Sequence, residues 1–236
     1  MKKIALVFSW ILFLCFNTLH AQKKQPQSPS APAEPIIEII TPLGTMKARL
    51  YNQTPLHQQR FLQLIQDKFY DSLIFHRVIE QFMIQGGDPK SKFATEETQL
   101  GGGTLPGERI PAEFHPQLIH KRGALAMARD NNPEKSSSNC QFYIVQGKVF
   151  DSTLWANLAE RKQRQGQQVM PYTAAQKEIY EKIGGTPHLD GEYTVFGEVF
   201  SGLEVIDKIA ALPKTPQNRT TPDIRMKIRV IGSTSH

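Results

Sequence analysis

The sequence FHRVIEQFMIQGGDP, residues 75–89, decides the fold class, because it holds parts of two short apolar stretches of strand length. Apolar runs of four to eight residues bounded by turn signals indicate buried strands, and we expect them at Leu73 to Ile79 and at Met83 to Gly86. The glycine-rich residues 86–109 that follow indicate a long surface loop. The centre of the chain is therefore predicted to be β structure.

Toward the N-terminus, the sequence predicts a hairpin followed by a helix. Residues 36–40 and 46–50 are strand-like and flank the turn signal Thr41-Pro42-Leu43-Gly44. Thr54 is then expected to be the N-cap of a helix that has Pro55 at its first position. An approximately helical apolar stripe follows in Leu56, Phe61, Leu64, Ile65 and Phe69.

Toward the C-terminus, short strands alternate with helical patterns. We expect strands at residues 123–127, 142–146, 193–200 and 224–231, and a final helix at 202–212. Residues 151–187 interrupt this rhythm with two helices, of which the second is opened by the capping-box pair Thr173 and Gln176. The fold class is therefore mainly β: a closed antiparallel barrel capped by two helices, plus a helical insertion.

The first 21 residues have the pattern of a secretory signal peptide. Two lysines precede an apolar run at residues 4–16, and Ala21 is the small residue that a signal peptidase requires. The run is shorter than the ~20 residues of a membrane-spanning helix, so we expect no stable membrane insertion after cleavage. A lipoprotein is the weaker alternative, because Leu12-Phe13-Leu14 precedes Cys15 where small residues are required.

We expect one folded domain, residues 36–233, after a linker rich in Pro, Gln and Ser at residues 22–35. Removal of residues 1–21 takes away two lysines and lowers the formal net charge from +6 to +6 − 2 = +4, which is too mild to indicate nucleic-acid binding. Cys140 is the only cysteine beyond the signal peptide, which excludes an intramolecular disulfide. We interpret Cys140 as a small semi-buried side chain rather than a nucleophile.

Four blocks of the sequence resemble the cyclophilins and follow the order of that family. The blocks are residues 75–89, residues 110–114, residues 123–128 with 138–144, and residues 188–191 with 195–197. Together they span most of residues 36–232 apart from the insertion. The resemblance implies an eight-stranded barrel with its substrate groove on the outer surface. It also implies a peptidyl-prolyl cis-trans isomerase that needs no cofactor.

The implied reaction is rotation about the C–N bond that precedes proline. Resonance makes the barrier ~18–20 kcal/mol, and no bond is broken during the rotation. A donor to the prolyl nitrogen and a dry pocket for the ring both favour the twisted state over the planar states. Arg77 suits the donor role because a guanidinium is always charged and rigid. The alternative interpretation of Arg77 is a structural ion pair on a strand.

The resemblance assigns the other site residues by position. It places Phe82, Met83, Tyr143 and Leu189 around the proline ring; without the motif each would be read as barrel core. It places Gln85 near the rotating carbonyl with Gln141 in support, and Ala128 and Arg129 along the client residues before proline. His188 and Tyr193 complete the groove where many eukaryotic members carry Trp and His. Tyr143 replaces the Phe of those members, and Arg129 replaces a commoner Asn.

Three questions stay open at this level. A non-catalytic module that binds proline-containing segments is the alternative to an enzyme, and Arg77 with its apolar neighbours favours the enzyme. A hydrolase is weaker still, because the sequence offers no recognisable triad motif. The insertion either contacts the client chain through a basic edge at Arg161, Lys162 and Arg164, or is a solvated helix pair without a role.

We expect proline-containing polypeptide clients, no nucleic acid, no metal and a monomer in the periplasm. His76 is interpreted as structural, because the implied reaction moves no proton.

Overall fold

The computed structural model describes residues 32–168 and 170–234 of the 236-residue chain. The predicted signal peptide, residues 1–21, lies outside these ranges, as does the linker up to residue 31. From Pro32 onward the residues cluster into one compact unit. In the described part of the chain, no helix has the length and apolar character needed to cross a membrane.

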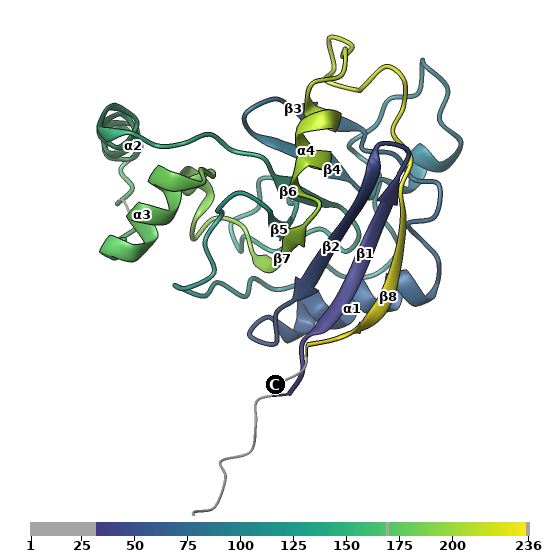
Figure 1. The fold of residues 1–236 in the computed structure, drawn as a ribbon, viewed down its shortest axis with the longest axis horizontal. Coiled ribbons are helices and arrows are strands. Elements are labelled where there is room, and N and C mark those ends of the chain that lie inside the picture. The colour runs from purple at the N-terminus through teal and green to yellow at the C-terminus, as the bar shows by residue number, and fades with distance from the viewer. Residues whose placement is uncertain (1–31, 169, 235–236) are drawn as a thin grey trace, which may run out of the picture. The chain divides into compact units, whose positions relative to one another are not determined.

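The described residues contain one antiparallel sheet with the strand order β3-β4-β6-β5-β7-β2-β1-β8 (Figure 1). Its strands are β1 (Pro35–Thr41), β2 (Gly44–Leu50), β3 (Arg77–Ile79), β4 (Met83–Gly86), β5 (Ala124–Met127), β6 (Phe142–Val145), β7 (Val195–Ser201) and β8 (Lys227–Ser233). The hairpin β1–β2 and the strand β4 lie where the sequence predicts them. Strand β3 begins later than expected, and only an isolated bridge at Ile74 precedes it.

The two ends of the sheet approach each other through the segments that precede β3 and β8. The amide of Phe75 donates to the carbonyl of Ile224 at 3.0 Å, and the amide of Met226 donates to the carbonyl of Leu73 at 2.8 Å. Within the described residues, the strand ladder is not continuous between β3 and β8. The eight-stranded antiparallel sheet is thus confirmed, whereas the closed barrel stays a prediction.

Two helices pack against the core of the sheet at their predicted positions, α1 (Pro55–Gln66) and α4 (Leu203–Ala210). Phe61 and Leu64 of α1 and Ile206 and Ile209 of α4 are buried in one apolar cluster with side chains from most of the strands. Aromatic rings dominate the centre of this cluster; Phe61 lies 5.2 Å from the ring of Phe142. These two helices are the expected caps.

The start of α1 corrects one detail of the sequence analysis. Thr54 occupies the N-cap position, but its side chain makes no capping hydrogen bond. The carboxylate of Glu113 caps the helix instead, accepting from the amides of Leu56 at 3.1 Å and His57 at 3.0 Å. A carboxylate is well suited to this place because unpaired amides give a helix N-terminus partial positive charge.

Residues 110–114, one of the blocks that resemble the cyclophilins and the counterpart of a strand in that family, form no strand in the structure. Ile110 makes an isolated bridge to Ser137, and the rest of this stretch is irregular. The stretch therefore serves α1 through Glu113 rather than the sheet.

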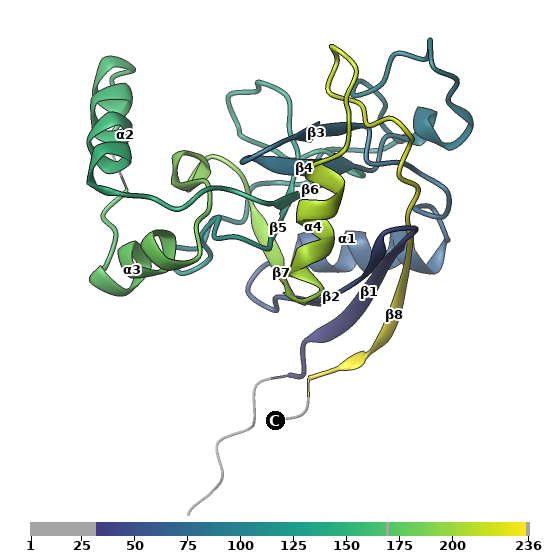
Figure 2. The ribbon, with the colours of Figure 1, turned by 45° about the horizontal axis from the view of Figure 1, so that its top comes forward.

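Residues 151–187, here called the helical segment, contain α2 (Ser152–Arg164) and α3 (Ala174–Lys182). The side chain of Asp151 caps α2, and the capping box of Thr173 and Gln176 forms as predicted. Figures 1 and 2 show both helices together on one side of the sheet, outside the strands. They share a small apolar cluster of their own, which includes Phe150, Leu158 and Tyr180. Two short 3₁₀ helices complete the fold, η1 (Pro89–Phe93) and η2 (Pro187–Leu189).

Candidate active site

The alternation of side chains along β3, β4 and β6 separates the core from an outer face. Val78, Ile84 and Ile144 point into the core, whereas their neighbours belong to the opposite face. Arg77 pairs with Gln85, and Gln85 pairs with Tyr143, across the antiparallel register. Since paired residues lie on the same face of a sheet, the register alone brings these three predicted site residues into one row.

This row borders a cavity of about 100 Å³, here called the Arg77 cavity. Most of the predicted site residues line it: Arg77, Phe82, Met83, Gln85, Ala128, Arg129, Tyr143, Leu189 and Tyr193. The two others lie beside it. His188 stacks on Phe82 with ring centroids 5.6 Å apart, and Gln141 contacts Gln85. The structure thus brings together all the residues that the sequence analysis selected.

A chain of hydrogen bonds holds the polar edge of the Arg77 cavity. Nη1 of Arg77 donates to Oε1 of Gln85 at 3.1 Å, and Nε2 of Gln85 donates to Oε1 of Gln141 at 3.1 Å. Nε2 of Gln141 in turn donates to the carbonyls of Gly101 at 3.0 Å and Gly103 at 2.6 Å. The order of donors fixes both amide groups, so one N–H of Gln85 is left for a ligand.

Arg77 has only this neutral partner on the described part of the chain. No ion pair among the described residues includes it. Burial lowers the pKa of its guanidinium below the ordinary value, which still leaves arginine charged near neutral pH. The interpretation of Arg77 as half of a structural ion pair is therefore not supported.

Arg129 is held in the cavity wall by a hydrogen bond and by an aromatic ring. Its Nε donates to the carbonyl of Glu192 at 2.8 Å, and its guanidinium lies 4.8 Å from the centroid of the Tyr193 ring. Tyr193 meets Tyr143 edge to face with centroids 5.9 Å apart. Stacking of a guanidinium on an aromatic face stabilises both groups, so we expect this side of the cavity to be well ordered.

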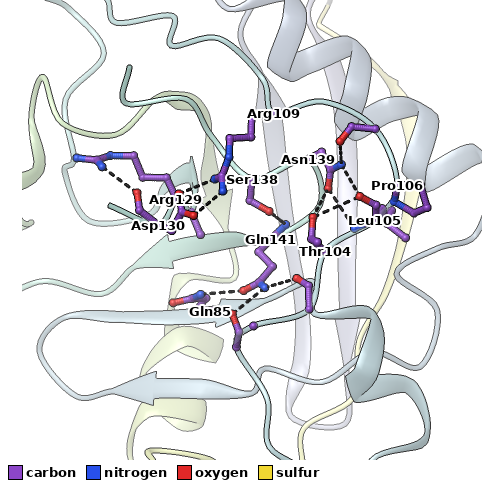
Figure 3. A pocket seen from close by; sticks show the side chains of 15 residues that line it. Gln85, Thr104, Leu105, Pro106, Arg109, Arg129, Asp130, Ser138, Asn139 and Gln141 are labelled. Atoms are coloured by element: carbon purple, nitrogen blue, oxygen red, sulfur yellow. Dashed lines mark hydrogen bonds and ion pairs between the residues drawn. The ribbon is translucent and has the colours of Figure 1, made fainter. Parts of the chain in front are cut away.

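A second cavity of about 480 Å³ adjoins the first and shares Gln85, Ala128 and Arg129 with it. We call it the glycine-loop cavity because residues 101–107 form one of its sides. Figure 3 shows Gln85, Gln141 and Asn139 around it, together with the bonds that hold the loop.

The glycine loop owes its close approach to the absence of side chains. Oδ2 of Asp88 accepts from the amides of Gly101 at 2.6 Å and Gly103 at 3.1 Å. A Cβ atom on Gly103 would lie 1.9 Å from Oδ1 of Asp88, so only glycine fits there. Asn139 fastens the far side, where its Nδ2 donates to the carbonyl of Leu105 at 2.9 Å. The sequence of this stretch predicts only a loop, and its run of glycines is the one signal of the close fit.

The structure also contains a Ser–His–Glu arrangement that the sequence did not reveal. Nε2 of His57 lies 2.9 Å from Oγ of Ser137, and Nδ1 lies 2.6 Å from Oε2 of Glu113. His57 is fully buried and Ser137 is 1% exposed, and neither lines the Arg77 cavity or the glycine-loop cavity. Burial also lowers the pKa of His57. A substrate has no access to this serine, so the arrangement stabilises the start of α1 and is not a hydrolase site.

His76 and Cys140 lie away from the Arg77 cavity. His76 is buried against a separate cavity of about 440 Å³, and burial lowers its pKa to about 4. Cys140 is fully buried, and burial raises the pKa of its thiol. Neither state suits a general base or a nucleophile near neutral pH. Among residues 32–168 and 170–234, no cluster of three or more His, Cys, Asp or Glu side chains is arranged as metal ligands.

Solved structures identify the fold. A crystal structure of a Cryptosporidium parvum cyclophilin-type peptidyl-prolyl cis-trans isomerase superposes with a TM-score of 0.61 at 24% identity, covering 85% of this chain and 99% of that one. A second crystal structure of that protein, determined in the presence of the dipeptide Ala-Pro, gives a TM-score of 0.60 at 25% identity over 84% of this chain. The sheet and its capping helices therefore form a cyclophilin-like fold.

Sequence comparison identifies the family. The family model "Cyclophilin type peptidyl-prolyl cis-trans isomerase/CLD" matches residues 36–230. A Staphylococcus aureus (strain USA300) protein with the provisional name of peptidyl-prolyl cis-trans isomerase is 34% identical over 182 residues, 77% of this chain and 83% of its own. A Streptococcus pyogenes protein, provisionally named a bifunctional phosphatase and peptidyl-prolyl cis-trans isomerase, is 35% identical over 193 residues, which is 80% of this chain and 37% of that protein.

The chain belongs to the cyclophilin-type peptidyl-prolyl cis-trans isomerase family. It is an enzyme of the isomerase class, as the sequence resemblance implied.

Proposed function

We propose that this enzyme accelerates rotation about X–Pro bonds in exported proteins while they fold, and that it binds the proline ring in the Arg77 cavity. The observation that carries the proposal is a cavity of about 100 Å³ in which Phe82, Met83 and Leu189 face the charged guanidinium of Arg77. Among the described residues Arg77 has a single, neutral hydrogen-bond partner, so its other N–H groups are available to a client peptide.

Each side of the cavity favours the twisted state of the X–Pro bond for a different reason. The prolyl nitrogen becomes pyramidal and basic as it leaves the amide plane, and a guanidinium N–H of Arg77 can then donate to it. Phe82, Met83 and Leu189 hold the ring in apolar surroundings, where this hydrogen bond is stronger than in water. The free N–H of Gln85 binds a client carbonyl, so the preceding residue can rotate against a fixed proline.

The glycine-loop cavity extends the same binding surface. It adjoins the Arg77 cavity at Ala128 and Arg129, the two residues assigned to the client residues before proline. We therefore assign the glycine-loop cavity to side chains on the N-terminal side of the proline. The crystal structure determined in the presence of Ala-Pro supports a proline-containing peptide as the ligand class.

The location, the oligomeric state and the closure of the sheet belong to the same proposal. Residues 1–21 support export by a signal peptide, with the periplasm as the destination. A monomer is the default state in this proposal. The hydrogen bonds between residues 72–75 and 224–226 support a barrel that closes at its last seam.

The decisive experiment follows cis-to-trans conversion of a short Ala-Pro peptide by the mature protein and by Arg77→Ala. We expect clear acceleration by the wild type and at least a tenfold fall in kcat/KM for the variant, which corresponds to about 1.4 kcal/mol. Arg164→Ala is the matched control, because Arg164 is exposed on α2 and pairs only with Glu160 in the structure. It should retain full activity.

The alternative function is a module that binds proline-containing segments without catalysis. A folded wild type that binds the Ala-Pro peptide but leaves its rate of isomerisation unchanged would establish that alternative. Equal activity of wild type and Arg77→Ala would instead remove Arg77 from the mechanism.

A further inference from the structure

A buried chain of hydrogen bonds connects the helical segment to Tyr143 in the wall of the Arg77 cavity. We propose that the helical segment positions this wall, by holding Tyr143 in place through Asp190 and His120. The proposal rests on the function proposed above and adds residues outside the cavity to the machinery of the site.

The chain of hydrogen bonds begins with two tyrosines of the helical segment. The hydroxyl of Tyr180, in α3, donates to Oδ2 of Asp190 at 2.6 Å, and the hydroxyl of Tyr172 lies 2.8 Å from the same oxygen. Oδ1 of Asp190 lies 2.8 Å from the amide nitrogen and 2.7 Å from Nδ1 of His120. Nε2 of His120 lies 3.0 Å from the hydroxyl of Tyr143.

The donors and acceptors of this chain have one consistent direction. A carboxylate only accepts, so Nδ1 of His120 carries the proton that faces Asp190. In the neutral imidazole Nε2 is then an acceptor, and Tyr143 donates to it. Burial raises the pKa of Tyr143 and Tyr180 well above the ordinary value, which keeps both phenols protonated as donors. Any break in this chain changes what Tyr143 can bond to.

Water cannot readily replace the side chains of this hydrogen-bond chain, because most of them are buried. His120 and Tyr180 are fully buried, Tyr143 is 4% exposed and Asp190 is 7% exposed. The His120 ring also stacks on Tyr143, with centroids 6.1 Å apart and planes at 15°. Because an unpaired polar group is costly at such a site, each member fixes the orientation of the next.

The helical segment is attached to this chain through packing as well as hydrogen bonds. The ring of Trp155, in α2, lies 5.2 Å from Tyr172 and 5.8 Å from Tyr180. The hydroxyl of Tyr172 also lies 2.8 Å from the carbonyl of Pro187, so its one proton is shared between two acceptors. Displacement of α2 or α3 therefore moves both hydroxyls that contact Asp190. Asp190 directly follows Leu189, which is itself a cavity residue.

A second contact runs from the helical segment to the same wall. Nζ of Lys162, in α2, lies 3.9 Å from Oε1 of Glu192, and Glu192 also pairs with Arg129 at 3.4 Å. Arg129 covers Tyr193, which meets Tyr143 edge to face. Both routes thus end at the pair Tyr143 and Tyr193.

The test is a double-mutant cycle that asks whether the effect of the tyrosines passes through Tyr143. The variant Tyr172→Phe/Tyr180→Phe removes both hydroxyls and keeps both rings. In the wild-type background we expect it to lower kcat/KM for an Ala-Pro peptide at least threefold. In the Tyr143→Phe background the same two substitutions should change kcat/KM less than 1.5-fold, which is no change within experimental error. Equal falls in the two backgrounds, or no fall in either, would overturn the proposal.

The control is Tyr70→Phe, which removes a phenol that is 1% exposed and donates to the carbonyl of Cys140 at 3.2 Å, outside the chain. It should leave kcat/KM unchanged while it lowers thermal stability, so that a general loss of stability is separated from positioning.

If the paired variant does not fold, Tyr172→Phe alone is used, since Tyr180 then still donates to Asp190. The same cycle is also measured as the dissociation constant for the Ala-Pro peptide. Loss of coupling in binding overturns the positioning role, whereas an inactive wild type that shows coupling in binding overturns only the proposed function.

Discussion

At the scale of single residues, the same physical effect gives neighbouring side chains different roles. Arg77 and His76 are adjacent in the sequence, and burial lowers the pKa of both. Arginine remains charged after such a shift, whereas histidine becomes neutral over most of the physiological range. Arg77 therefore offers a charge to the Arg77 cavity, while His76 is buried as a neutral ring outside that cavity.

The buried state of His76 predicts a pH dependence of stability. Its pKa is about 4 in the folded protein and 6.5 ordinarily, so the unfolded chain binds the extra proton between these values. The contribution of neutral His76 to the free energy of unfolding is full above pH 6.5 and is lost as the pH falls toward 4. His76→Phe should therefore lose about 2 kcal/mol less free energy of unfolding than the wild type between pH 7 and pH 4.5.

Urea unfolding of both proteins at the two pH values measures this difference. His188, whose pKa burial also lowers to about 4, titrates in both proteins and cancels in the comparison. Parallel losses in the wild type and His76→Phe would show that His76 is not the group responsible.

At the scale of elements, α1 depends on a carboxylate that is distant in sequence. Glu113 caps this helix and also contacts Nδ1 of His57 at 2.6 Å, whereas the Thr54 hydroxyl has only a long contact of 3.4 Å to Tyr51. A helix end that is capped from another part of the chain links local and tertiary structure. The identity of the cap is therefore not visible in the sequence around Pro55.

This arrangement predicts that Glu113, although distant in sequence, contributes more to the free energy of unfolding than Thr54 does. Glu113→Ala should lower the free energy of unfolding by about 1–3 kcal/mol, because it leaves two amides and a buried histidine without their acceptor. Thr54→Val keeps the shape of the side chain and loses one long hydrogen bond, so it should cost less than Glu113→Ala, about 0.5–1 kcal/mol. Chemical denaturation of the two variants at pH 7 checks the order, and a larger loss in Thr54→Val would restore the capping role that the sequence suggested.

The basic edge predicted for α2 is narrower in the structure. Arg161 and Arg164 are exposed, but Lys162 is buried and faces Glu192. Contact with client proteins is therefore tested at the two arginines alone. Deletion of residues 152–186 is a poorer test, because it also removes Tyr172 and Tyr180, whose hydroxyls contact Asp190 outside the Arg77 cavity.

We expect Arg161→Ser/Arg164→Ser to slow the catalysed refolding of a proline-limited protein about threefold while conversion of the Ala-Pro peptide is unchanged. The physical reason is the loss of attraction between this edge and acidic segments of an unfolded client, which also decreases with salt. Lys208→Ser on α4 is the control for an exposed cation elsewhere. Equal catalysis of the refolding reaction by the variant and the wild type would assign α2 no client contact.

At the scale of the whole molecule, the sequence predicted elements better than it predicted their connections. The hairpin, the four helices and the residues of the Arg77 cavity follow from local patterns and from a motif. The chain from Tyr143 to Asp190 does not, because its bonds join residues 23 and 70 positions apart with no periodicity between them. His120 was therefore missed, and the glycine loop was read only as a loop, since its fit against Asp88 is visible only in three dimensions.

The pairing of β1 with β8 has a consequence for how the chain can be rearranged. Pro35 lies opposite Ser233, and Glu34 and Thr234 exchange hydrogen bonds between their backbones at 2.8 Å and through the threonine hydroxyl at 2.9 Å. The start and the end of the domain therefore leave the sheet side by side. A few flexible residues are enough to join them, and new termini can then be opened in an exposed loop elsewhere. The order in which the strands are synthesised can thus be changed by circular permutation while every pairing of the sheet is kept.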